Sequence, residues 1–307
     1  MKHQHAHSHA RHPAFTSLNR AFLIGIGLNL LFVIAEFIVG FWQDSMGLLS
    51  DAGHNLSDVV SLVLAMLAFR LAKVQPTPRY TYGYKKSTVL ASFLNAVILL
   101  VAVGVILAES IDKLIHPRPV EGGVIAWVAG AGVLVNAATA WLFMKDKDKD
   151  LNVKGAFLHM AADALVSVGV MVSGIVILHT GWNRIDPIIG LLIAAVIVYS
   201  TWGLLHDSIR LSLDGVPNGL ELGKIEETIC AVPGVKNVHH LHIWPISTTE
   251  TALTAHIRIA GPQHMEEIKH QIKCQLAAHG ISHATLEFET SEQPCEDEGD
   301  LCVVRKK

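Results

Sequence analysis

The stretch Leu48-Leu-Ser-Asp-Ala-Gly-His-Asn-Leu-Ser-Asp58 opens an apolar run that is long enough to cross a bilayer as a helix. His54 and Asp58 are four residues apart within it, so on a helix they share one face. A second long apolar run repeats this spacing at His159 and Asp163. A charged group near the bilayer centre costs about 2.5–3.5 kcal/mol on insertion scales and needs a partner. We therefore expect the two His-x-x-x-Asp pairs to face each other.

Together the two pairs supply two imidazole nitrogens and two carboxylate oxygens, which is a complete tetrahedral ligand set for zinc. Each residue alone has a plainer explanation, because one His can bond a carbonyl and one Asp can hold a helix pair together. Three ionisable groups within eight residues, Asp51, His54 and Asp58, favour a functional site instead. Asp51 is one position off the shared face and is predicted to be accessory, as a supporting group or a proton carrier.

The composition also indicates a membrane protein, since 51% of the 307 residues are hydrophobic and 17% are charged, against about 25% charged in soluble domains. The predicted fold is an α-helical membrane protein with six transmembrane helices and a C-terminal cytoplasmic α+β domain of ferredoxin-like αββαβ order. The apolar runs cover roughly 18–41, 49–71, 87–111, 123–144, 155–178 and 187–205. The predicted parts are a His-rich disordered tail (1–16), a six-helix transmembrane domain (17–210), a cytoplasmic ferredoxin-like domain (211–290) and a tail rich in Cys and acidic residues (291–307).

The distribution of Lys and Arg predicts the orientation of the helices in the membrane. One side of the membrane is assigned three groups of basic residues: Lys2, Arg11 and Arg20; Arg70, Lys73, Arg79, Lys85 and Lys86; and Lys145, Lys147, Lys149 and Lys154. The opposite side holds only Lys113, Arg118 and Arg184. This asymmetry predicts a multi-pass protein of the cytoplasmic (inner) membrane with both termini in the cytoplasm.

Two polar features of the N-terminal region leave alternatives open. The first twelve residues contain five histidines, which fits loose metal capture or a plain solvated tail. Glu36, inside the first apolar run, either faces the helix bundle and pairs there or lies near the far membrane surface beside Trp42. The second alternative is favoured, because Trp is enriched at membrane interfaces.

The region after about Asp214 has the periodicity of a small soluble domain. Its order, helix-strand-strand-helix-strand, is that of a ferredoxin-like module. The predicted elements are a helix at 218–231, strands at 237–246 and 251–260, a helix at 263–279 and a strand at 284–289.

Histidine is denser in this domain than folding requires, so we expect some of these residues to bind metal. Strand alternation predicts His240 and His242 on one face and His239 on the other, with His256 opposite on the next strand. Glu287 and Glu289 lie on the last strand. Outside the domain, Cys295 and Cys302 could add thiolates, but their six-residue gap is not a standard zinc-knuckle spacing.

With paired His-x-x-x-Asp motifs on the second and fifth of six runs, the chain resembles the cation diffusion facilitator family, and most closely its zinc-transporting branch. Supporting matches are Leu49-Ser-Asp-Ala-Gly-His-Asn-Leu-Ser-Asp58, Tyr82-Gly-Tyr84, His116-Pro117, Asp186-Pro187 and Leu241-His-Ile-Trp244. The resemblance covers about 17–290. Two departures stand out: Lys85 follows Tyr84 where some members carry a loop His, and the loop between the fourth and fifth runs is short, as in compact bacterial forms.

The resemblance implies a homodimeric zinc/proton antiporter that exports Zn²⁺ from the cytoplasm, for zinc homeostasis and resistance. It implies that the two His-x-x-x-Asp pairs form the transport site. It also implies a cytoplasmic domain that dimerises and binds regulatory zinc. The residues matching this regulatory site best are His239, His256 and Glu289, with His264 and Glu287 as further candidates.

The ligand set itself suggests the mechanism. His and Asp bind metal only when deprotonated, so zinc and protons compete for the same side chains. Proton entry from outside can then drive the metal out of the cytoplasm. The same ligands predict cadmium or cobalt as further transported ions. Nucleic acid is not an expected partner. The chain is predicted not to be an enzyme. A membrane-embedded metalloenzyme would need an open metal position and a base, for which Asp51 is the only candidate. A membrane-anchored metal sensor would need no ionisable residues at bilayer depth.

Overall fold

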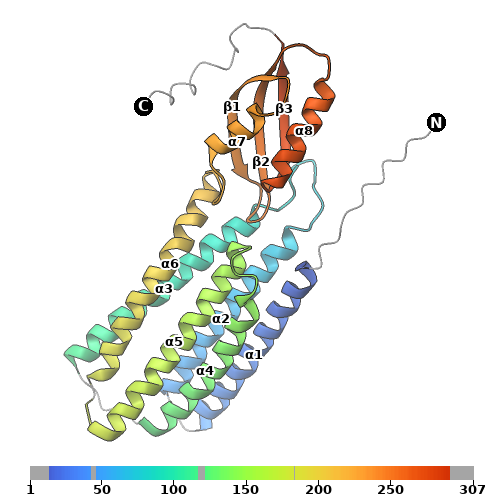
Figure 1. Ribbon diagram of the computed structural model, residues 1–307. Coiled ribbons are helices and arrows are strands. Elements are labelled where there is room, and N and C mark those ends of the chain that lie inside the picture. The colour runs from blue at the N-terminus through green and yellow to red at the C-terminus, as the bar shows by residue number, and fades with distance from the viewer. Residues whose placement is uncertain (1–13, 43–45, 117–121, 183, 291–307) are drawn as a thin grey trace. The chain divides into compact units, whose positions relative to one another are not determined.

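The computed structural model describes residues 14–42, 46–116, 122–182 and 184–290. Residues 1–13 of the predicted His-rich tail, Cys295 and Cys302 lie outside them, as do the side chains of Asp51 and His54 in an otherwise described helix. Residues 14–16, predicted as the end of the disordered tail, belong instead to the first helix. Figure 1 shows the elements. The helices of the first two thirds are α1 (Ala14–Trp42), α2 (Met46–Leu71), α3 (Ser87–Ile115), α4 (Gly122–Met144), α5 (Leu151–Thr180) and α6 (Ile185–Ser212). Then come α7 (Leu222–Cys230), β1 (Val235–Pro245), β2 (Thr251–Ile259), α8 (Met265–Ala278) and β3 (Ile281–Glu289).

The predicted fold class is confirmed as a helical membrane domain followed by a small αββαβ unit. Among the described residues, four helical segments are long and apolar enough to span a membrane, and they lie in α1, α3, α4 and α6. The helices outside this set, α2 and α5, carry the two His-x-x-x-Asp pairs. Several side chains of α2 and α5 lie outside the described part of the chain, so membrane crossing by these two helices stays a prediction.

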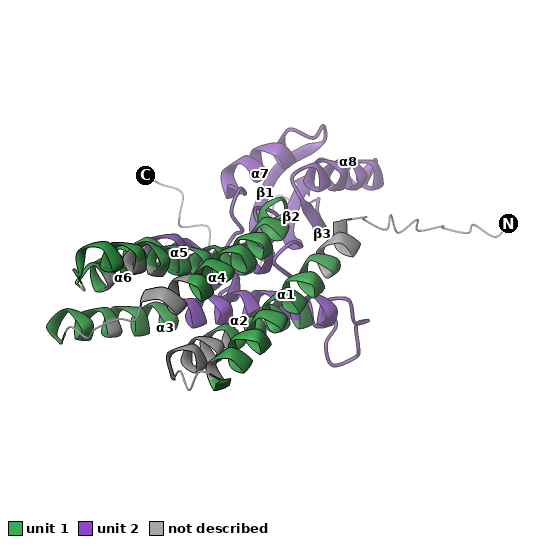
Figure 2. Cartoon of the chain, turned by 90° about the horizontal axis from the view of Figure 1, so that it is seen from below, with its two compact units in different colours: residues 1–67, 101–147, 156–198 green, residues 68–100, 148–155, 199–307 purple. Residues whose placement is uncertain are grey.

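The chain divides into two compact units, which Figure 2 colours separately. The first comprises residues 1–67, 101–147 and 156–198, and the second comprises 68–100, 148–155 and 199–307. In the first unit, α1 packs on α4 through Phe22 and Phe143, whose ring centroids are 4.8 Å apart. In the second, Ser92 on α3 and Ser208 on α6 are hydrogen-bonded at 3.1 Å.

The sheet of the second unit has the order β1-β2-β3, with β1 and β2 antiparallel and β2 and β3 parallel. A parallel neighbour needs a crossover connection, and α8 supplies it. Apolar residues at helical spacing turn α7 and α8 toward one common core, Ile225 and Ile229 on α7 and Ile272 and Leu276 on α8. This core fixes the strands that carry the histidines.

Candidate metal centres

The first candidate centre joins α2 and α5 through Asp58, His159 and Asp163. His159 Nε2 lies 2.7 Å from Asp58 Oδ1 and 3.7 Å from Asp163 Oδ2. One ligand atom of each residue lies within 4.8 Å of the other two. All three residues are buried, with exposed fractions of 1%, 2% and 9%. The predicted meeting of α2 and α5 is therefore present in the structure for three of the four side chains.

The spacing of these atoms fits a small metal ion. Ligands of a tetrahedral zinc site lie about 3.3 Å from one another, given metal–ligand distances near 2.0–2.1 Å. The distances of 2.7 and 3.7 Å from His159 Nε2 bracket that value. Among the described residues, Asp58 Oδ2 and His159 Nδ1 are buried without a hydrogen-bond partner. Buried polar atoms normally have one, so this donor set is suited to a cation.

His54 completes the predicted set, and the backbone of α2 places it one helical turn before Asp58. Its side chain and that of Asp51 lie outside the described residues, so their part in the centre stays a prediction.

Asn29 on α1 supports the centre from beside His159. Its amide nitrogen donates to Gly25 O at 2.9 Å and to Thr139 Oγ1 on α4 at 3.1 Å, and it lies 3.6 Å from Met160 Sδ on α5. Met160 directly follows His159 and is fully buried. Polar contacts between helices hold their register where lipid gives no hydrophobic driving force. Asn29 thus helps to fix α5 where the centre is built.

Glu36 corrects an expectation from the sequence. The favoured position beside Trp42 at the membrane surface is wrong, because Glu36 is 3% exposed and accepts a hydrogen bond from Asn55 Nδ2 at 2.7 Å. Trp42 is 83% exposed. The partner lies on α2, directly after His54, so the bond ties α1 to α2 close to the first centre.

The second candidate centre lies on the sheet and consists of His239, His256 and Glu289. The strand register pairs His239 on β1 with His256 on β2. Glu289 on β3 brings one oxygen, Oε1, to 3.1 Å from both His239 Nε2 and His256 Nδ1. These three donors also lie within 4.8 Å of one another. Two imidazoles and a carboxylate with a further open position can hold zinc.

A β-bulge changes the predicted alternation of the histidines. The register of β1 against β2 is irregular between His239 and His242, and His240 has a left-handed φ of 50°. The His240 ring consequently contacts both the His242 ring, at 4.7 Å between centroids, and the His256 ring, at 4.9 Å. Burial lowers the pKa of His242, and the nearby His240 and His256 lower it further.

The remaining predicted ligands of the described residues, Glu287 and His264, do not join this centre. Glu287 Oε2 lies 3.6 Å from His256 Nε2, on the other side of the ring. His264 is exposed at the start of α8 and its Nδ1 lies 3.5 Å from Glu267 Oε2. The sequence did not single out Arg258, whose guanidinium lies 3.5 Å from Glu289 Oε2. Its position two residues after His256 on the same strand is the signal that could have indicated it.

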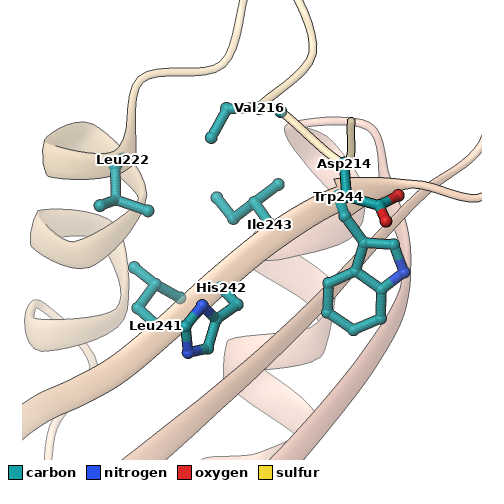
Figure 3. A pocket seen from close by; sticks show the side chains of 8 residues that line it. Asp214, Val216, Leu222, Leu241, His242, Ile243 and Trp244 are labelled. Carbon is teal, nitrogen blue, oxygen red and sulfur yellow. The ribbon is translucent and has the colours of Figure 1, made fainter. Parts of the chain in front are cut away.

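The second unit also has a cavity of about 480 Å³ between β1 and the segment before α7. Figure 3 shows its lining, which is largely apolar, with His242, Asp214 and Trp244 as the polar or amphipathic members. Of the histidines in ring contact with one another, His239, His240, His242 and His256, the cavity lining includes His242. The cavity lining offers no set of three metal donors among the described residues.

Both parts of the chain match families of known proteins. The cation efflux transmembrane domain family matches residues 22–211, and the cytoplasmic domain of cation efflux proteins matches 217–291. The zinc transporter ZitB of Escherichia coli K12 is 37% identical over 96% of this chain and 94% of its own length. The cadmium, cobalt and zinc/H⁺-K⁺ antiporter of Bacillus subtilis 168 is 34% identical over 88% of each chain. The cation efflux system protein CzcD of an Alcaligenes strain is 36% identical, covering 94% of this chain and 91% of that protein.

Proposed function

Because the chain belongs to the cation efflux family of membrane transporters, the cation diffusion facilitators, we propose that it exports Zn²⁺ from the cytoplasm in exchange for protons. The observation that carries the proposal is the buried cluster of Asp58, His159 and Asp163 on two helices of the matched transmembrane domain. Members of this family transport ions and are not enzymes. Cadmium and cobalt, named for the Bacillus subtilis relative, are proposed as further cargo.

The exchange follows from the chemistry of the ligands. Imidazole and carboxylate bind a metal only when they have lost their protons, so loading with Zn²⁺ displaces protons from the cluster. Protons that arrive from the outer side in turn displace Zn²⁺. When the cluster opens alternately to each side, the downhill entry of protons drives Zn²⁺ outward. We propose His54 as the fourth ligand, which gives zinc its preferred four-coordinate set.

We assign the sheet centre a regulatory role. A resident Zn²⁺ would be held by His239, His256 and Glu289, whose shared carboxylate oxygen suits a single ion. We propose that Glu287 and His264 bind only after their side chains rearrange. Bound zinc would hold the three strands together and so report cytoplasmic zinc.

The assembly and location follow from the same family membership. We propose a homodimer in the cytoplasmic membrane of a bacterium, with both termini in the cytoplasm. The matched cytoplasmic domain at 217–291 is the proposed contact between the two chains. The excess of Lys and Arg near the ends of the helices supports this orientation.

The test is zinc flux into proteoliposomes that carry a pH gradient. Asp58→Asn and Asp163→Asn each remove one anionic ligand with little change of shape, and flux should fall by at least about a hundredfold. Ser61→Ala is the matched control, because Ser61 is a buried residue of α2 three positions after Asp58. It should transport like the unmodified protein. Undiminished flux through both Asp variants would remove the transport-site assignment.

A further inference from the structure

The loop between β1 and β2 contacts two of the long helices within the second unit. The loop is closed on itself by a hydrogen bond from Ile246 N to Glu250 O at 2.8 Å and by Ser247 Oγ, which accepts from the amides of Thr249 and Glu250. A loop closed in this way presents its tip in one fixed conformation. At this tip, Thr248 forms hydrogen bonds to residues outside the loop.

Thr248 donates its hydroxyl hydrogen to Asp150 Oδ2. Asp150 is buried, with 6% exposed, and directly precedes α5. Its other oxygen, Oδ1, accepts from the backbone amides of Asn152 at 2.7 Å and Val153 at 3.3 Å. One carboxylate therefore caps the first turn of α5 and holds the loop. The pKa of the Asp150 carboxyl is raised above its ordinary value, because the effect of burial outweighs the opposing effect of the hydrogen bonds that the carboxylate accepts.

The start of α3 supplies the second side of this contact. The Thr248 amide donates to Thr88 Oγ1 at 3.1 Å, and Thr88 is 2% exposed. Lys85 forms an ion pair with Glu250 of the loop at 2.6 Å, and Lys86 Nζ donates to the carbonyl of Pro245 at 3.1 Å. Thr248 thus bonds to α3 through its backbone and, through its side chain, to Asp150, the residue that caps α5.

Both ends of this connection lead to a candidate metal centre. The strands joined by the loop are those that carry His239 and His256. The helix capped by Asp150 is the one that carries His159 nine residues later and Asp163 thirteen residues later. An α-helix transmits a displacement of its first turn along its length, because each turn is hydrogen-bonded to the next.

We propose that Thr248 and Asp150 are positioning residues for transport: their hydrogen bond fixes the start of α5 to the β1–β2 loop and thereby sets the rate at which the α2–α5 cluster turns over. The inference rests on the transport site proposed above. Neither residue touches the transported ion. The effect should accordingly fall on the maximal rate and leave the zinc KM nearly unchanged, since the ligand side chains stay in place.

The test compares two threonines of the same loop in the full-length protein in proteoliposomes. Thr248→Val removes the hydroxyl, keeps the side-chain shape and keeps the amide that bonds to Thr88. We expect its maximal zinc flux to fall about tenfold, as befits the loss of one hydrogen bond to a charged group. The zinc KM should stay within about twofold. Thr249→Val is the matched control, because Thr249 is exposed and, among the described residues, its hydroxyl bonds only to Ser247 of the same loop. It should transport normally.

Conservative variants and an independent readout separate positioning from folding. Thr248→Ser restores the hydroxyl and should restore flux, while Asp150→Asn keeps a capping oxygen and should transport better than Asp150→Ala. Amide hydrogen exchange at Asn152 and Val153 should be faster in Thr248→Val than in Thr249→Val. The inference is overturned if Thr248→Val transports normally, or if Thr248→Ser is as slow as Thr248→Val. Normal flux in Asp58→Asn would instead refute the transport site, so the two failures are distinguishable.

Discussion

The hydrogen bond between Asn55 Nδ2 and Glu36 Oε2 places a carboxyl group inside the part of the protein that is matched to the transmembrane domain. A buried amide that loses its acceptor costs about 1–3 kcal/mol, whereas exchange of one acceptor oxygen for another costs less. The residue at position 36 therefore matters first as an acceptor for Asn55.

This predicts a difference between two substitutions at that position. Glu36→Ala should lower the stability of the protein by about 1–3 kcal/mol, and Glu36→Gln by clearly less, because glutamine keeps an oxygen for Asn55. Thermal unfolding of the purified protein in detergent gives the comparison. If the two variants are equally destabilised, the charge of Glu36 and not its hydrogen bond holds α1 to α2.

The sequence indicated which residues meet at the first centre but misplaced Glu36. Spacing of four residues puts His159 and Asp163 on one face whatever surrounds the helix, and burial of charge makes a partner necessary. The face of α1 that turns inward depends on where Asn55 lies, and no local pattern encodes that contact. Trp42 suggested a surface position from a statistical preference alone.

The elements of the cytoplasmic part could be predicted because their periodicity is strong, and the structure has all five in the predicted order. The bulge in β1 could not, since it depends on a left-handed backbone at His240, which is uncommon for a residue other than glycine. Strict alternation would put His240 on the face opposite to His239. The bulge instead brings its ring against His256.

The register of β1, β2 and β3 predicts that zinc stabilises the cytoplasmic domain. A ligand present at a hundred times its Kd stabilises a fold by about 2.7 kcal/mol. In a background carrying Asp58→Asn and Asp163→Asn, zinc should still raise Tm, and a chelator should reverse the rise. His239→Ala should abolish this zinc-dependent shift. His279→Ala, at an exposed histidine after α8, should retain it. A full shift in His239→Ala would refute the sheet centre.

At the scale of the whole molecule, charge segregation and six apolar runs were enough to predict a membrane domain followed by a soluble one. Four described segments meet the length and hydropathy of a membrane span. For α2 and α5, which carry the two His-x-x-x-Asp pairs, membrane crossing remains a prediction from the sequence.

The proposed homodimer predicts a defined mass. A single chain has a mass of 33.3 kDa, and native mass spectrometry after release from detergent should give a species of two chains. The dimer should persist in Asp58→Asn, because that residue lies in the membrane domain and not in the proposed contact. A monomer at micromolar concentration would contradict the assignment of the cytoplasmic domain as the dimer contact.

Arg258 has a consequence for how tightly the sheet can retain an ion. Its guanidinium lies beside the second oxygen of Glu289, so part of the anionic charge there is balanced before any divalent ion arrives. An incoming ion gains less Coulombic attraction than it would from an unopposed carboxylate. We therefore expect the proposed sheet centre to take up zinc when zinc is abundant and to release it when the concentration falls, and not to retain it permanently.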